Sequence, residues 1–153
     1  MLVNGYNLQN KTVLEIGKFS ILWNCFEHDW CSNNCNPDKI KSIVKSIQFD
    51  REKQSQFAKV LNNRRNWFGQ LEIDYVRESL HPGSARASKE DDIQIMRQFL
   101  EQEGDDFDLI CGCLLVIYRI RNNLMHGLKL IEELDGQIEL FRAANDVLES
   151  IGG

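Results

Sequence analysis

The chain contains few residues that break or cross-link a fold. Its 153 residues include only two prolines, and its five cysteines are odd in number and fall in two clusters. A complete set of intrachain disulfides is therefore not expected. No apolar run reaches the ~20 residues of a membrane-spanning helix, and the first residues lack the basic-then-apolar order of a secretory signal. We expect a cytoplasmic protein with no membrane partner.

The sequence also lacks internal repeats and the strict alternation of apolar and polar residues that indicates β-strands. Apolar residues recur instead at helical spacing, for example along Lys11–Trp30. Asp50 is expected to cap a helix that extends to Leu80, and residues 130–150 are expected to form the last helix. We predict an all-α, up-and-down helical bundle of about five to six helices, forming a single domain over residues 1–153.

Charge is distributed unevenly over a chain whose net charge is −5. Asp38–Arg77 contains nine basic and five acidic residues, whereas Glu90–Asp108 contains one basic and eight acidic residues. An acidic protein of this kind can still present one basic surface to RNA. Solvated helix faces are the commoner explanation for such charge, and both interpretations stay open.

One segment is typical of a buried central helix. Residues 107–120 are apolar at almost every position from Leu109 to Tyr118, and a helix that is apolar nearly all round lies inside a fold. Asn122 and Asn123 follow, and asparagine favours caps and turns over helix interiors. We expect the helix to end at this pair and to carry Arg121 out of the core to the surface.

The most informative motif comes at this boundary. Arg121 lies five residues before His126, Asn122 follows the arginine directly, and Gly127 follows the histidine. A permanently charged guanidinium and a group that titrates near neutrality are the parts needed to cleave a phosphodiester without a metal. The motif resembles the R-x4-6-H signature of HEPN domains, in which a polar residue usually follows the arginine.

The resemblance to HEPN domains implies both a fold and a function. These domains are helical bundles of about this size, and many are metal-independent endoribonucleases that act as dimers. We therefore expect RNA as substrate, a homodimer with the site at or near its interface, no cofactor, and a role as a toxin or abortive-infection effector. An antitoxin or activating partner is implied as well. Many HepT-type toxins extend the signature to H-x-Y, and Leu128 occupies that tyrosine position here.

The motif assigns a role to each of three candidate catalytic residues. His126 would act as general acid or base, Arg121 would bind the phosphate through parallel hydrogen bonds, and Asn122 would orient His126 or the phosphate. Positions five apart on an unbroken helix point about 140° apart. Convergence of Arg121 with His126 therefore needs a turn between them or a second copy of the site. A HEPN-type module that binds RNA or protein without cutting is the alternative.

Two further sets of residues are weaker candidates for contact with RNA or support of the site. Arg64 and Arg65 offer guanidiniums for phosphate, and Trp67 offers an indole for base stacking. The more frequent arrangement buries such a tryptophan and leaves the arginines solvated. Arg119, with Glu27, could support the site as a charged pair, and an ordinary surface ion pair explains the same residues equally well.

A cluster of cysteine and histidine residues provides a competing hypothesis, in which the chain is a helical interaction protein with a structural zinc site. The spacing C-x2-H-x2-C-x3-C lacks the C-x2-C knuckle of common zinc motifs, and we expect no metal. Its first cysteine is expected instead in the core, because free cysteines are often buried. The four candidate ligands are Cys25, His28, Cys31 and Cys35.

Cys111 and Cys113 belong to the second cysteine cluster. Residues two apart do not share a helix face, so these two thiols are expected to serve packing. Gly112 between them is small enough to allow a neighbouring helix to approach closely.

Overall fold

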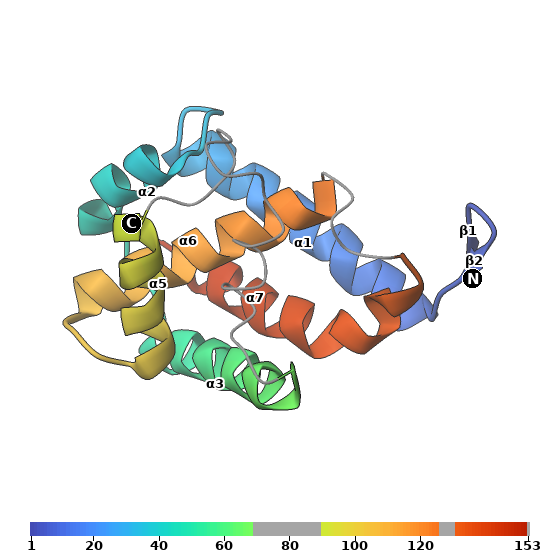
Figure 1. Cartoon of the computed structure of the whole chain (residues 1–153). Coiled ribbons are helices and arrows are strands. Elements are labelled where there is room, and N and C mark those ends of the chain that lie inside the picture. Colours follow the sequence, from blue (N-terminus) through green and yellow to red (C-terminus); the bar gives the residue numbers. More distant parts are fainter. Residues whose placement is uncertain (69–89, 126–130, 153) are drawn as a thin grey trace.

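The computed structural model describes residues 1–68, 90–125 and 131–152, apart from the side chains of residues 64–68, 90, 125 and 131–133. Within these ranges the protein is an all-α helical bundle, as predicted (Figure 1). A two-stranded hairpin, β1 (Leu2–Val3) and β2 (Tyr6–Asn7), precedes the bundle. The α-helices are α1 (Asn10–Trp30), α2 (Pro37–Ile43), α3 (Arg51–Phe68), α5 (Glu90–Glu101), α6 (Asp106–Met125) and α7 (Ile138–Ser150).

Helix α6 passes through the centre of the bundle, where it packs most extensively against α5 (Figure 1). Helix α7 packs against both α1 and α3, which completes the enclosure of the core. Every residue of α6 from Leu109 to Ile117 is buried, so the predicted central helix is confirmed. Within the described residues, no helix combines the length and the apolar character needed to cross a membrane.

Gly112 sets the distance between α5 and α6. A Cβ atom at this position would lie 2.5 Å from the backbone oxygen of Ile95 and 2.6 Å from Cβ of Phe99. Both neighbours belong to α5, so only a residue without a side chain permits this approach. Cys111 and Cys113, on either side of the glycine, are buried. The predicted packing role of this cysteine cluster is thereby confirmed.

Side-chain caps mark where two of the helices begin. Asn36 accepts a hydrogen bond from the backbone N–H of Lys39 at 2.8 Å, directly before Pro37 opens α2. Asp50 accepts hydrogen bonds from the backbone N–H groups of Glu52 and Lys53 at 2.9 and 3.3 Å. These caps satisfy N–H groups that have no partner inside the helix. Asp50 is therefore the cap of α3 that the sequence predicts, and the predicted continuation of this helix to Leu80 lies outside the described residues.

Two parts of the structure differ from the sequence prediction. The last helix begins at Ile138 rather than near residue 130, because a 3-10 segment, η2 (Ile131–Gln137), comes first and contains Gly136. The N-terminal hairpin was not expected at all. Its turn is formed by Asn4 and Gly5, which have φ angles of 49° and 87°, and Asn-Gly is the residue pair that tight hairpins favour.

Candidate functional site at the end of α6

Helix α6 does not end at the asparagine pair, as the sequence had suggested, but continues to Met125. Asn122 and Asn123 are 6% and 4% exposed. Burial of the last turns against the rest of the bundle therefore outweighs the preference of asparagine for caps and turns. The turn expected at Asn122 and Asn123 is absent, because the chain is helical there. It therefore does not bring Arg121 and His126 together.

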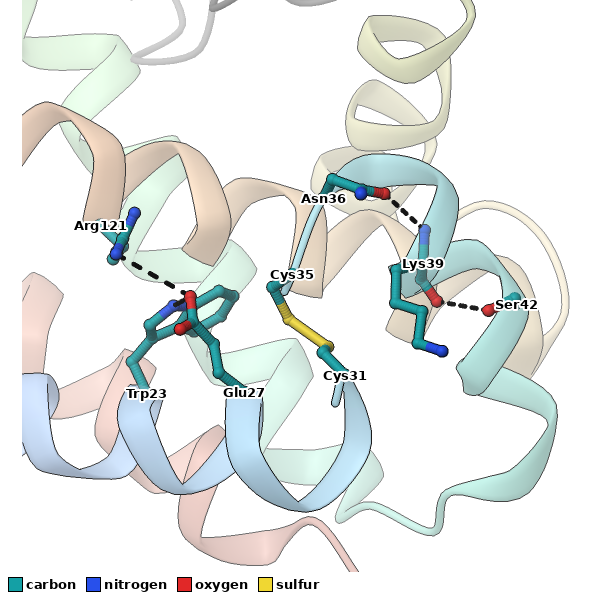
Figure 2. Close-up of a disulfide and its surroundings, with 8 residues drawn as sticks. All are labelled: Trp23, Glu27, Cys31, Cys35, Asn36, Lys39, Ser42 and Arg121. Carbon is teal, nitrogen blue, oxygen red and sulfur yellow. Dashed lines mark hydrogen bonds and ion pairs between the residues drawn. A yellow bond between two sulfur atoms is a disulfide. The ribbon is translucent and has the colours of Figure 1, made fainter. Parts of the chain in front are cut away.

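Arg121 is held at the edge of the core by residues of two helices. Its Nη1 donates a hydrogen bond to Oδ1 of Asn122 at 3.1 Å, and its Nη2 lies 3.9 Å from Oε1 of Glu27 on α1. The Arg121 side chain is 31% exposed. Figure 2 shows its guanidinium directed from α6 toward the carboxylate on α1. The result is a guanidinium that is fixed in place and still reaches solvent.

The Glu27 carboxylate is itself anchored in the core. Its Oε1 accepts a hydrogen bond from Nε1 of Trp23 at 2.6 Å (Figure 2). The Trp23 side chain is buried, and its ring lies 5.2 Å from the ring of Phe26 and 6.2 Å from that of Tyr118 on α6. Trp23 and Tyr118 were not predicted to support the site, although Trp23 and Glu27 are four residues apart and so share one helix face.

Arg119 is buried, at 6% exposed, and burial lowers the pKa of its guanidinium. A buried guanidinium does not contact an RNA strand on the surface, so Arg119 belongs to the interior of the bundle here. Glu27 forms its ion pair with Arg121, which lies two residues closer to the C-terminal end of α6. Of the two arginines, Arg121 is thus the one presented to solvent.

Several of the sequence candidates lie outside the described residues. These are His126, Gly127 and Leu128. Arg64, Arg65 and Trp67 lie in helix α3, but the structure does not describe their side chains. The structure therefore brings together Arg121, Asn122 and Glu27, with Trp23 behind them, and His126 remains a candidate from the sequence alone.

The cysteine and histidine cluster takes a form that the sequence did not predict. Cys31 and Cys35 form a disulfide, and zinc binding requires cysteines as free thiolates. Nδ1 of His28 lies 3.2 Å from Oδ1 of Asn33. Among the described residues, no group of three or more His, Cys, Asp or Glu side chains is arranged to hold a metal ion.

Cys25 is exposed, contrary to the expectation that it belongs to the core. The buried residues of α1 in this region are Trp23 and Phe26, and Cys25 lies away from the face that they define. Among the described cysteines, Cys25 is the thiol most open to solvent, while Cys111 and Cys113 are enclosed.

Comparisons of the chain with protein-family models, with curated proteins and with solved structures find no match. The resemblance to HEPN domains is carried by the Arg121–His126 motif and by the order of the helices around it.

Proposed function

We propose that the protein is a metal-independent endoribonuclease of the HEPN type. The observation that carries the proposal is the position of Arg121. Its guanidinium is partly exposed at the last turn of the central helix, fixed by Glu27 and Asn122, and five residues before His126. Guanidinium groups bind phosphate oxygens in parallel hydrogen bonds, and a preorganised donor stabilises charge that develops during the reaction.

The chemistry uses the nucleophile that RNA already carries. His126 removes the proton of the 2′-hydroxyl, or protonates the 5′-oxygen that leaves, because an ordinary histidine titrates near pH ~6.5. Arg121 stabilises the charge that develops on the phosphate, and Asn122 holds the guanidinium through its Oδ1. The products are a 2′,3′-cyclic phosphate and a 5′-hydroxyl, and DNA, which lacks the 2′-hydroxyl, is not cut.

A homodimer accounts best for how the two catalytic residues meet. Because α6 is helical through Met125, the chain does not turn back toward Arg121 within the four residues that follow this arginine. Two copies that place their α6 ends together would combine the arginine of one with the histidine of the other. They would also provide two histidines, one as base and one as acid. The resemblance to HEPN domains further implies that the protein acts as a toxin or defence effector and that a partner protein or an activating signal controls it.

One observation favours a second function, an RNA- or protein-binding module that does not cut. Both terminal nitrogens of Arg121 face protein acceptors, Oδ1 of Asn122 and Oε1 of Glu27, as they would in a purely structural arginine. The distance to Glu27 is longer than a hydrogen bond, and a guanidinium has five N–H donors. Donors therefore remain for a phosphate, and His126 provides a proton-transfer group that a binding module does not need, so we favour the nuclease.

The test is cleavage of a labelled RNA in excess EDTA, with the ends of the products identified by mass. The nuclease predicts 2′,3′-cyclic phosphate and 5′-hydroxyl ends, and an uncut DNA strand of the same sequence. Retention of RNA on the protein without any product would instead establish the binding module. Cleavage that requires a divalent metal would contradict the proposed chemistry.

A further inference from the structure

The end of α1 is closed by a small disulfide-bridged loop that has no role in the proposed chemistry. Cys31 is the first residue after α1, and Cys35 lies directly before Asn36, which caps α2. The disulfide joins these two cysteines across four positions of the chain. It therefore fixes the end of one helix to the start of the next, as Figure 2 shows.

The backbone of this loop passes through the left-handed region at two residues. Ser32 and Asn33 have φ angles of 52° and 65°, a conformation that asparagine adopts readily but that is disfavoured for serine. The backbone N–H of Asn33 donates to the carbonyl of Glu27 at 2.9 Å, and that of Cys31 donates to the same carbonyl at 3.1 Å. The disulfide adds a covalent link to a loop that these hydrogen bonds also close.

Glu27 connects this loop to the candidate site. Its carbonyl accepts the two hydrogen bonds that close the loop, and its carboxylate accepts from Trp23 and pairs with Arg121. Opening of the loop would free the last turn of α1, because helix ends fray when their carbonyls lose partners. The position of the Glu27 carboxylate, and with it the support of Arg121, therefore depends on the closed loop.

We propose that the pair formed by Cys31 and Cys35 is a reversible redox switch that controls how firmly Arg121 is held. The proposal rests on the proposed function wherever it speaks of RNA cleavage. The oxidised form keeps the loop closed and Glu27 in place. The reduced form frees the end of α1, so the guanidinium loses its preorganisation and cleavage slows.

The redox step is an exchange with a low-molecular-weight thiol. Its thiolate attacks the sulfur of Cys35, which is half-buried, rather than that of Cys31, which is 1% exposed. A mixed disulfide forms at Cys35, and Cys31 leaves as a thiolate and takes up a proton. A second thiol attacks the external sulfur, which gives two cysteine thiols and one small-molecule disulfide. Two electrons and two protons enter the protein, and the reverse reaction closes the loop.

The test is hydrogen–deuterium exchange of the intact chain, before and after treatment with a dithiol reductant. Reduction should speed exchange of the Cys31 and Asn33 amides about tenfold to thirtyfold, from the entropy that closing a ring of this size removes. The Cys35→Ser variant should exchange as fast without reductant. The Cys25→Ser variant is the matched control, because Cys25 is exposed and free, and it should respond to reduction as the wild type does.

Cleavage of RNA by the oxidised and reduced forms separates this proposal from the proposed function. Faster exchange together with slower cleavage after reduction supports both. Faster exchange in a protein that cuts no RNA in either form supports the loop switch and overturns the nuclease. Exchange that stays the same in the reduced wild type and in Cys35→Ser overturns the switch, even if RNA is cut.

Discussion

Glu27 on α1 and Arg121 on α6 form an ion pair in which Oε1 and Nη2 are 3.9 Å apart. The carboxylate is 17% exposed and the guanidinium 31%, so the pair lies at the boundary between core and solvent. Trp23 fixes the carboxylate from the inside through a 2.6 Å hydrogen bond. Trp23 therefore fixes the carboxylate with which Arg121 pairs.

We expect Glu27→Ala to weaken both the fold and the site. The variant leaves the indole N–H of Trp23 without its charged acceptor, and a part-buried hydrogen bond to a charged group contributes about 1.5–3 kcal/mol. Glu27→Gln keeps an oxygen acceptor and should lose less than half of that free energy. Urea unfolding measures the stability, and RNA cleavage should fall about tenfold in Glu27→Ala because Arg121 loses its orientation.

Glu149→Gln is the matched control for this prediction. Glu149 pairs with Lys18 on the surface, where both side chains are nearly half exposed, and such pairs contribute about 0–1 kcal/mol. Its unfolding midpoint and its cleavage should match those of the wild type. A Glu27→Ala protein as stable as the Glu149→Gln protein would show that the hydrogen bond to Trp23 does not hold the site.

Substitution by alanine should have opposite effects on stability at two helical glycines, one of which lies at the close approach of α5 and α6. Gly112→Ala places a methyl group 2.5 Å from the carbonyl oxygen of Ile95, so the helices must separate, at a cost of about 1–3 kcal/mol or more. Gly17→Ala, inside α1, meets no atom within 4 Å and should stabilise the protein by about 0.5–1 kcal/mol. Thermal unfolding of the two variants measures both. Equal melting temperatures would contradict the packing described here.

The buried thiol of Cys111 predicts a loss of stability at high pH. Burial raises the pKa of Cys111 from 9.0 to about 11, so the folded protein holds this proton more tightly than the unfolded chain. The stabilisation is complete below pH 9 and is lost as pH rises through about 11. Between pH ~8 and ~10 this group alone should reduce the free energy of unfolding by about 1 kcal/mol.

Urea unfolding at the two pH values measures this loss, with Cys111→Ala compared against Cys25→Ala. Removal of Cys111 should flatten the pH dependence, while removal of the exposed Cys25 should leave it as in the wild type. Burial raises the pKa of Cys113 as well, so some dependence should remain in Cys111→Ala. The same slope in both variants would rule out Cys111 as a source.

The helical architecture could be predicted from the sequence because buried helix positions are occupied by apolar residues. The run from Leu109 to Ile117 is apolar at every position except Gly112, and it is the central helix. Asp50 precedes a helix with the side chain that caps prefer, and it caps α3. The hairpin at Asn4 and Gly5 was missed although its turn carries a known pair, because two-residue strands are too short to alternate.

The candidate site was predicted less completely, because its contacts join side chains of α1 and α6 that lie far apart in the sequence. The sequence singled out Arg121 and Asn122, and the structure places them in contact. It also suggested a helix end at Asn122, where burial keeps the chain helical. The spacing of Cys31 and Cys35 does not distinguish a pair of metal ligands from a disulfide, so the disulfide could not be predicted from the sequence.

The most direct test of the proposed nuclease is RNA cleavage in excess EDTA by the wild type, Arg121→Ala, His126→Ala and Arg142→Ala. Arg142 is a matched control, because it is a partly exposed arginine of α7 that pairs with Glu15 and Glu139. We expect the first two substitutions to reduce cleavage at least ~100-fold, because they remove a phosphate ligand and a proton-transfer group, and Arg142→Ala to cut like the wild type. Cleavage at the wild-type rate by folded Arg121→Ala or His126→Ala would contradict the proposed nuclease.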